Sequence, residues 1–348
     1  MKTPKISIII IHYNTPQYLQ TCLDGIFKQS HKNIEVIFID NDSPDDSGLK
    51  FVTEHYKDKE NLVIVPNEDN LGYSKAANQG IEMAIERENP ADYVVITNPD
   101  IIYSPSYFEK IIHRVEKDTK IAAVTGKVYK YDFKNKKPTK IIDTVGLIAF
   151  KNRRIIDDGQ GIEDVGQFDK EKEVFGVSGA CPLYRREALE DVKINGEYLD
   201  EDFFMYKEDV DLSWRFQLYG WKCIYYPSAI AFHGRGTGIH KRFSMGQLLK
   251  HRGKLSKFQK HYSFKNQHLM EVKNESWGTF LRDFPRILLK KIVAPFYITL
   301  FEPYLWKSYL DCFKQLPEAL KKRKIIQKNK KVSTAVMSKK FKSKSSYL

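Results

Sequence analysis

Short apolar runs rich in β-branched residues alternate with helical patterns over the first hundred residues of the chain. Four of these runs have the length of buried strands: 6–11, 34–39, 62–65 and 93–97. The segments between them have the apolar spacing of helices: about 17–29, 47–56 and 74–88. Continuous apolar strands joined by helices are typical of a parallel sheet that is covered on both faces. We therefore predict an α/β fold with a doubly wound, mostly parallel sheet.

The pattern changes further along the chain. Residues 127–172 are rich in Lys, Asp and Gly and predict long loops with short strands. After about residue 282, apolar clusters interleaved with Lys and Arg predict helices, and after about residue 327 the residues are mostly Lys and Ser, which predicts disorder. We therefore expect three units. Residues 1–245 form an α/β domain with two parts, 1–126 and 127–245. Residues 246–325 form a basic helical extension, and residues 326–348 form a disordered basic tail.

The net charge of +13 is unevenly distributed. From Arg282 to the end there are 17 basic and 4 acidic residues, whereas residues 1–281 carry 40 of each and are neutral. A nucleic-acid-binding protein would carry its positive charge on the folded face. We therefore expect no nucleic-acid partner and look for another reason for the basic end of the chain.

The basic end has the composition of a segment that binds anionic membranes. Between residues 284 and 313, apolar and aromatic residues are interleaved with Lys and Arg, and Pro285, Pro295 and Pro303 are expected to divide the segment into short helices. Such a mixture lies in the headgroup region of a bilayer, and each Lys or Arg adds about 1 kcal/mol there. The alternative is a helical pair packed on the catalytic domain, followed by a solvated tail.

Cysteine usage and hydropathy bear on the compartment. The four cysteines are far apart and fit no metal-binding spacing: Cys22, Cys181, Cys223 and Cys312. We expect them to be free thiols in a reducing cytoplasm. The N-terminus lacks a signal-peptide pattern, and no run reaches the roughly 18 apolar residues that span a bilayer. These features predict a cytoplasmic protein at the inner face of the cell membrane.

Polar residues directly follow three of the predicted strands, where ligands bind in sheets of this kind. They are His12-Tyr13-Asn14, Asp40-Asn41-Asp42 and Asn98-Pro99-Asp100. At such a place the Asp100 carboxylate can hold a divalent cation against a diphosphate, although an Asn-Pro-Asp sequence is also a common turn. Asp40 can accept a hydrogen bond from the N3–H of a pyrimidine base or cap the helix that follows it.

Six carboxylates lie between Asp200 and Asp211, with Phe203, Phe204, Met205 and Tyr206 among them. Burying these charges is costly without cations or hydrogen-bond donors. The mixture indicates either a carboxylate held against an apolar cleft as a general base or a capped helix start. His233 ends another predicted strand before a glycine-rich loop, where it can complete a metal site, contact a phosphate or serve the fold.

In this order and spacing, the blocks resemble the family 2 glycosyltransferases, and within them the bacterial rhamnosyltransferase-like members. The resemblance covers about residues 5–240, and more loosely extends to about 325. The blocks that carry it are Ser7 to Asn14, Glu35 to Ser43, Asn70-Leu71-Gly72-Tyr73, Asn78-Gln79-Gly80, Asn98-Pro99-Asp100, Ser178-Gly179-Ala180-Cys181 and Asp200 to Arg215. The metal motif of the family is often Asp-x-Asp, and this chain has Asn98 at its first position.

The resemblance implies a GT-A fold and a metal-dependent, inverting hexosyl transfer from a nucleotide-sugar donor. Residues 1–126 then bind the donor, and residues 127–245 bind the acceptor and catalyse the reaction. The implied base is Asp209, and the implied ligands of Mg²⁺ or Mn²⁺ are Asp100 and His233. The implied donor-binding residues are His12, Tyr13, Asn14, Asp40, Asn70 and Asn98. The implied acceptor-binding residues are Asp200, Glu201, Glu208 and Trp214.

The resemblance also suggests substrates. The stretches at 142–146, 157–161 and 174–176 look like those of enzymes that use dTDP-rhamnose, whereas related sequences use UDP- or GDP-sugars. The implied acceptor is a lipid-linked or other oligosaccharide of polysaccharide or cell-wall synthesis. A nucleotidyltransferase is the alternative enzyme, but it normally carries a Gly-rich loop after the first strand, and the chain has none there. The sequence leaves a homo-oligomer open.

Overall fold

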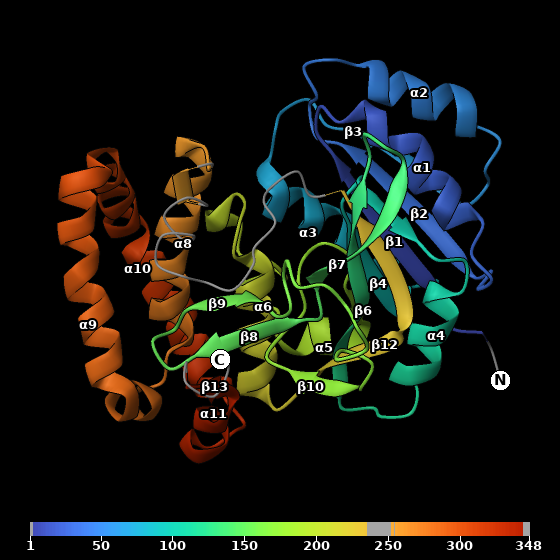
Figure 1. Ribbon diagram of the computed structural model, residues 1–348. Helices are drawn as coiled ribbons and strands as arrows, with labels where there is room; N and C mark the ends of the chain where they lie inside the picture. The colour runs from blue at the N-terminus through green and yellow to red at the C-terminus, as the bar shows by residue number, and fades with distance from the viewer. Residues whose placement is uncertain (1–2, 235–251, 254, 344–348) are drawn as a thin grey trace.

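The computed structural model describes residues 3–234, 252–253 and 255–343 (Figure 1). Strands and helices alternate through its first part, as the apolar pattern predicts. The strands are β1 (Ile6–His12), β2 (Ile34–Asp40), β3 (Leu62–Pro66), β4 (Tyr93–Thr97) and β5 (Ile101–Tyr103). The helices are α1 (Pro16–Phe27), α2 (Ser47–Tyr56), α3 (Gly72–Ile85) and α4 (Tyr107–Val115).

The middle of the chain contains the short strands that its composition predicts. Residues 127–172 were expected as long loops with short strands, and the second half of the long strand β6 and three further strands lie there. The strands of this part are β6 (Ile121–Asp132), β7 (Lys137–Thr144), β8 (Leu147–Phe150), β9 (Ile155–Asp157), β10 (Lys172–Val174), β11 (Leu183–Arg185) and β12 (Lys222–His233). The helices are α5 (Arg186–Asp191), the 3-10 turn η1 (Glu201–Phe203) and α6 (Glu208–Tyr219).

The central sheet has ten strands, in the order β10-β12-β6-β11-β4-β1-β2-β3 with β5 beside β12 and β7 beside β6. Strand β1 pairs in parallel with β2 and β4, β2 pairs in parallel with β3, and β6 pairs in parallel with β12. Strands β5, β7, β10 and β11 are antiparallel to their neighbours. The predicted α/β fold with a mostly parallel central sheet is confirmed.

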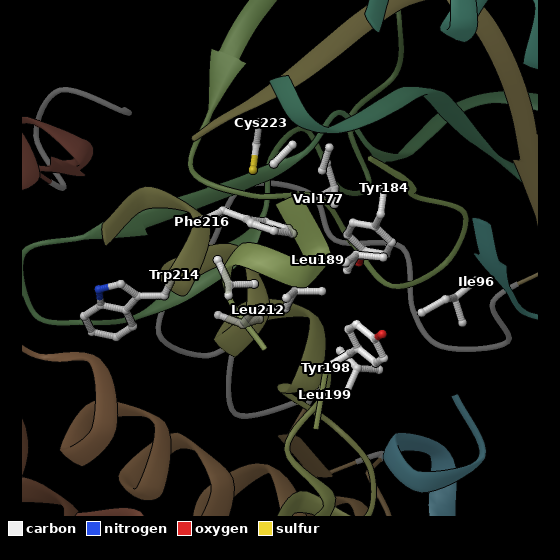
Figure 2. Packing of buried hydrophobic residues seen from close by; sticks show 14 of the residues in the cluster. Ile96, Val177, Tyr184, Leu189, Tyr198, Leu199, Leu212, Trp214, Phe216 and Cys223 are labelled. Carbon is white, nitrogen blue, oxygen red and sulfur yellow. The ribbon is translucent and has the colours of Figure 1, made fainter. Parts of the chain in front are cut away.

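Strand β1 shows why its sequence is almost entirely apolar. All seven of its residues are buried, and they alternate between the two faces of the sheet. Ile6, Ile8 and Ile10 belong to the core under α1, α2 and α4, whereas Ile9 and Ile11 belong to the core under α3, α5 and α6. Figure 2 shows part of the second core, where Phe216 of α6 packs against the side chains of the sheet.

The extension forms a separate group of helices at one end of the molecule (Figure 1). Its elements are α8 (Lys257–Asn274), α9 (Trp277–Phe301), the 3-10 turn η2 (Pro303–Leu305), α10 (Trp306–Asn329), α11 (Thr334–Lys340) and β13 (Phe341–Lys342). The predicted boundary at residue 245 lies outside the described residues. None of the helices in the described ranges combines the length and the apolar character needed to cross a bilayer.

Two predictions about this extension are wrong. Pro285 and Pro295 lie inside the 25-residue helix α9, which they do not divide. A proline removes only one amide donor from a helix, and the other hydrogen bonds of a long helix can hold it together. The tail is also ordered as far as residue 343, because α11 follows α10 and β13 pairs with β8 beside the catalytic part. Apolar residues such as Met337 and Phe341, both buried, anchor it there.

Candidate active site

A cavity of about 600 Å³ lies at the carboxyl ends of β1, β2 and β4. It is closed on the other side by residues of the loop between η1 and α6 and by Phe258 of α8. Predicted donor-binding and metal-binding residues line it together: Tyr13, Asn70, Asn98 and Asp100. The loops after the strands therefore meet as the sequence predicts.

Asp40 and His12 do not line this cavity, and their contact with the donor stays a prediction. Both are buried, and His12 Nδ1 lies 2.6 Å from Asp40 Oδ1. Burial alone would raise the pKa of Asp40, but hydrogen bonds from His12 and Ser43 outweigh it and lower that pKa. Asn14 also lies outside the lining, where its backbone N–H donates to Ser43 Oγ at 2.9 Å.

The residue that sequence reasoning missed here is Asn41. It lines the cavity, its amide donates to Asn70 Oδ1 at 3.1 Å, and its side-chain oxygen accepts from the backbone N–H of Leu71 at 3.2 Å. These bonds fix Asn41 and Asn70 as one unit at the wall. Its signal was present in the sequence, because it directly follows Asp40 at the end of the same strand.

Asp100 and His233 come together as predicted. His233 Nε2 lies 3.3 Å from Asp100 Oδ1, and His233 Nδ1 lies 2.8 Å from Asp143 Oδ2. Burial alone would lower the pKa of His233, but Asp143 and Asp100 raise it to about 9. Asp143 is fully buried. It belongs to the stretch 142–146, which resembles stretches of enzymes that use dTDP-rhamnose. In the structure it orients the imidazole of His233.

Asp209 is the second residue of α6 and lies in its first turn. Its Oδ2 accepts the backbone N–H of Gly179 at 2.7 Å, and Tyr73 Oη, which lines the cavity, donates to the Gly179 carbonyl at 3.3 Å. Burial raises the pKa of Asp209, and the Gly179 hydrogen bond and Lys207 partly oppose that rise. Burial followed by the charge of Asp209 raises the pKa of Glu208 to about 8. The negative charge of Asp209 therefore favours the protonated, neutral form of Glu208.

The loop before α6 has a backbone that ordinary residues rarely adopt. Phe204, Tyr206 and Lys207 have positive φ angles of 62°, 70° and 75°. Asn266 of α8, fully buried, donates from one amide nitrogen to the carbonyls of Phe203, Met205 and Tyr206 at 2.9, 2.9 and 2.8 Å. The loop also needs Gly72, because a Cβ there would lie 2.4 Å from the Phe204 ring. The extension therefore holds the loop that leads to Asp209.

Asp200 is held in a buried ion cluster and does not line the cavity, so its contact with the acceptor stays a prediction. Its side chain pairs with Lys273 of α8 and lies 2.6 Å from Lys322 of α10. These two cations outweigh burial and lower the pKa of Asp200. Glu201, half-buried, accepts from Asn78 Nδ2 at 3.0 Å and is likewise absent from the cavity lining.

The structure also buries Trp214, which was predicted to bind the acceptor. Its side chain is 1% exposed and packs in the core against Phe175 and Phe341. All but one of the residues of α6 are buried, so the sequence of this helix has no polar face to indicate which side chains reach a ligand. The four cysteines are free thiols, as predicted.

Comparison with known proteins agrees with this geometry. The family model described as Glycosyl transferase family 2 matches residues 7–193. An N-acetylglucosaminyl-diphospho-decaprenol L-rhamnosyltransferase of Mycobacterium tuberculosis is 26% identical over 270 residues, which cover 70% of this chain and 79% of that protein. A poly-beta-1,6-N-acetyl-D-glucosamine synthase of Staphylococcus aureus is 26% identical over 233 residues, which cover 65% of this chain and 49% of that protein.

The fold has a solved counterpart. The crystal structure of GalNAc-T7 with UDP, GalNAc and Mn²⁺ matches with a TM-score of 0.54 and 12% sequence identity, covering 78% of this chain and 52% of that one. This similarity supports the GT-A type of fold and carries no more than the fold. The family match spans more than half of the 348 residues, and the chain belongs to glycosyl transferase family 2.

Proposed function

We propose that the protein transfers a sugar, with inversion, from a nucleotide-sugar donor to the hydroxyl of a lipid-linked saccharide. The observation that carries this proposal is the meeting of two groups at one cavity. Asp100 lines one side of it, with His233 Nε2 3.3 Å from its carboxylate. Tyr73 lines another side and donates to the carbonyl of Gly179, whose N–H donates to Asp209. Tyr13, Asn41 and Asn70 form a further part of the wall, where the nucleoside would bind.

The residues at Asp100 fit a divalent cation. A carboxylate and an imidazole 3.3 Å apart suit Mn²⁺ or Mg²⁺ when other oxygens complete the shell. Among the described residues no cluster of three or more His, Cys, Asp or Glu could hold a metal ion, so the diphosphate and water would supply the remaining ligands. When bound, the cation stabilises the negative charge on the departing nucleoside diphosphate. Asp143 would orient His233 as a ligand.

Asp209 has the surroundings of a general base. In the proposed step the acceptor oxygen forms a bond to the anomeric carbon, the bond from that carbon to the diphosphate breaks, and the hydroxyl proton passes to Asp209. Burial raises the pKa of Asp209 toward the range in which a carboxylate accepts a proton efficiently. Gly179 holds the carboxylate in place through its N–H.

The finer assignments rest on the relatives. The mycobacterial relative is named for transfer of L-rhamnose to N-acetylglucosaminyl-diphospho-decaprenol, which supports a dTDP-rhamnose donor and a lipid-linked acceptor here. Apolar side chains exposed along α9 support peripheral binding to an anionic membrane, where such an acceptor lies.

A donor screen tests the proposal. Purified protein is incubated with UDP-, GDP- and dTDP-sugars and with N-acetylglucosaminyl-diphospho-lipid, with and without Mn²⁺, and nucleoside diphosphate release is measured. We expect release from dTDP-rhamnose that needs both metal and acceptor. Turnover of UDP- or GDP-sugars alone would overturn the rhamnosyl assignment, and failure of every donor would overturn the transferase proposal.

A further inference from the structure

A second cavity, of about 460 Å³, lies between α8, α9 and α10 and shares no lining residue with the candidate active site. Its volume is in the range of roughly 300–1,000 Å³ that small-molecule sites occupy. Helix α9 approaches η2 and α11 closely, but it stands off from α8 and α10 (Figure 1). The space between the three helices is lined mostly by apolar side chains, among them Val272, Phe280, Ile287, Phe313 and Leu316.

The apolar lining continues onto the surface of the same helices. Large apolar side chains are exposed along α9 and α10: Trp277, Leu281, Phe284, Leu288, Leu289, Ile292, Val293, Phe296, Leu300, Phe301, Trp306, Leu310, Phe313 and Leu320. A large amount of exposed apolar surface marks a place where something apolar binds. An occupant of the cavity can therefore extend from it onto further apolar side chains.

The lining of the cavity carries one more cation than carboxylate: Arg153, Lys291 and Arg323 against Glu271 and Glu275. Glu271, buried at the lining, is paired with both Lys290 and Lys291, at 2.9 and 2.6 Å, so that one carboxylate faces two ammonium groups. Burial alone would raise the pKa of Glu271, but these two lysines lower it to about 2. Arg323, also at the lining, donates to the backbone carbonyls of Val272 and Glu275 at 2.5 and 2.6 Å, which are neutral partners.

The apolar walls and the positive charge together indicate which class of ligand the cavity can bind. A purely apolar ligand would leave the surplus positive charge of the lining uncompensated, and a small anion would leave the apolar walls exposed. An amphiphile that has a hydrocarbon chain and a phosphate satisfies both.

The position of the cavity relates it to the candidate active site. Helix α8, which forms one wall, also carries Asn266, whose amide holds the loop before Asp209. Helix α8 therefore links the cavity to the loop that precedes Asp209.

We propose that the cavity between α8, α9 and α10 binds the hydrocarbon chain of a phosphate-bearing isoprenoid lipid, with its phosphate beside Lys291 and Arg323. The proposal rests on the proposed function only in taking this lipid to be the carrier of the acceptor sugar. Binding of the lipid can be measured without any sugar or nucleotide.

The test is calorimetric titration of the full chain with geranylgeranyl diphosphate, a short isoprenoid that carries the required headgroup. Leu316→Trp fills the cavity, and Leu310→Trp makes the same change on the same helix at an exposed position outside the lining. We expect Leu316→Trp to weaken binding at least about tenfold and Leu310→Trp to change it less than about twofold. Equal affinities of the two variants would overturn the proposal.

The headgroup is tested separately with Lys291→Gln. This change leaves Lys290 to pair with Glu271, so the fold is expected to survive. It should weaken binding of geranylgeranyl diphosphate about fivefold and leave binding of geranylgeraniol unchanged. Loss of binding of both ligands to the same extent, or binding of inorganic diphosphate as tight as that of the lipid, would contradict the assignment of the phosphate.

Two other occupants of this face have distinct outcomes. A dimer in sedimentation experiments that does not bind the lipid would assign the face to a second copy of the chain. Binding to anionic vesicles that Leu316→Trp leaves intact, without uptake of geranylgeranyl diphosphate, would assign it to the bilayer surface. Either result overturns the cavity proposal. A chain that binds the lipid but releases no nucleoside diphosphate in the donor screen refutes the proposed function alone.

Discussion

The α/β part of the chain and its helical extension are stabilised by different mixtures of contacts. In the α/β part, strands such as β1 bury apolar side chains on both faces of the sheet. The extension shares apolar contacts such as those of Met337 and Phe341 with that core, and it adds buried ions and amides: Lys273 and Lys322 face Asp200, and Asn266 binds the loop before α6. Apolar burial is non-directional, whereas these contacts depend on individual partners.

The buried ions of the extension explain how the acidic segment 200–211 can be packed inside the protein. Its six carboxylates would be costly to bury by themselves, and the extension provides the cations that compensate several of them. Asp211, fully buried, meets Arg215 at 3.1 Å and Lys273 at 3.0 Å, and it accepts from Asn274 Nδ2 at 2.7 Å. The extension is therefore part of the candidate active site and not an appendage to it.

The largest effect is expected where the two regions meet, at Asp209. In Asp209→Asn the side-chain oxygen can still accept the N–H of Gly179, but the proton acceptor is lost. We expect kcat for transfer to fall by about 10²–10⁴-fold. Donor affinity, measured by calorimetry, should stay nearly the same. Turnover within about threefold of wild type would remove Asp209 from the mechanism.

The attachment of the extension is tested by Lys322→Met. Lys322 lies 2.9, 2.6 and 3.0 Å from carboxylate oxygens of Glu197, Asp200 and Asp202, and its removal leaves buried charge with fewer partners. We expect the free energy of unfolding to fall by about 3–5 kcal/mol. The matched control is Lys321→Met, because Lys321 is exposed and pairs only with Glu318 among the described residues. A similar loss in both variants would show that the ion cluster does not hold the extension.

Asp143→Asn tests the support of the predicted metal ligand in the α/β part. Asp143 accepts from His233 Nδ1 at 2.8 Å, and an amide in its place orients the imidazole less firmly. We expect the Mn²⁺ concentration needed for half-maximal activity to rise by about 10–100-fold. The maximal rate at saturating Mn²⁺ should change less than that concentration. An unchanged requirement for Mn²⁺ would contradict a metal-ligand role for His233.

The smallest effect concerns pH. Burial, followed by the charge of Asp209, raises the pKa of Glu208 from its ordinary value to about 8. The folded protein therefore binds this proton more tightly than the unfolded chain does, and the stabilisation is lost as pH rises from the ordinary carboxyl range to about 8. Tm measured between pH 5 and 9 should fall more steeply for wild type than for Glu208→Gln. Parallel curves would show that Glu208 is not responsible.

The α/β part could be predicted because its signals are local. The strand at 93–97 and the helix at 47–56 match β4 and α2 in full, and four predicted site residues line the cavity. Asn41 was missed in favour of Asp40 because neighbouring side chains at a strand end point in different directions. The apolar pattern alone does not say which of the two faces the ligand.

The extension could not be predicted in the same way, because its contacts join distant residues. Lys322 and Asp200 are 122 positions apart, and Asn266 and Tyr206 are 60 apart. A basic run such as 321–324 contains one buried lysine among exposed ones, and composition does not distinguish them. The prediction that Pro285 and Pro295 end helices failed for a related reason. It rested on the local preference of proline, whereas α9 continues through both residues.

The central claim is that both regions together form the site for sugar transfer. It is tested most directly by Asn266→Ala, with Ser263→Ala on the same helix as the control, measuring kcat for transfer and donor affinity side by side. Losing the three carbonyl contacts should displace the loop before Asp209 and lower kcat by about 10–100-fold, while donor affinity changes less than about threefold. If Asn266→Ala folds and turns over like Ser263→Ala, the extension does not position the catalytic loop.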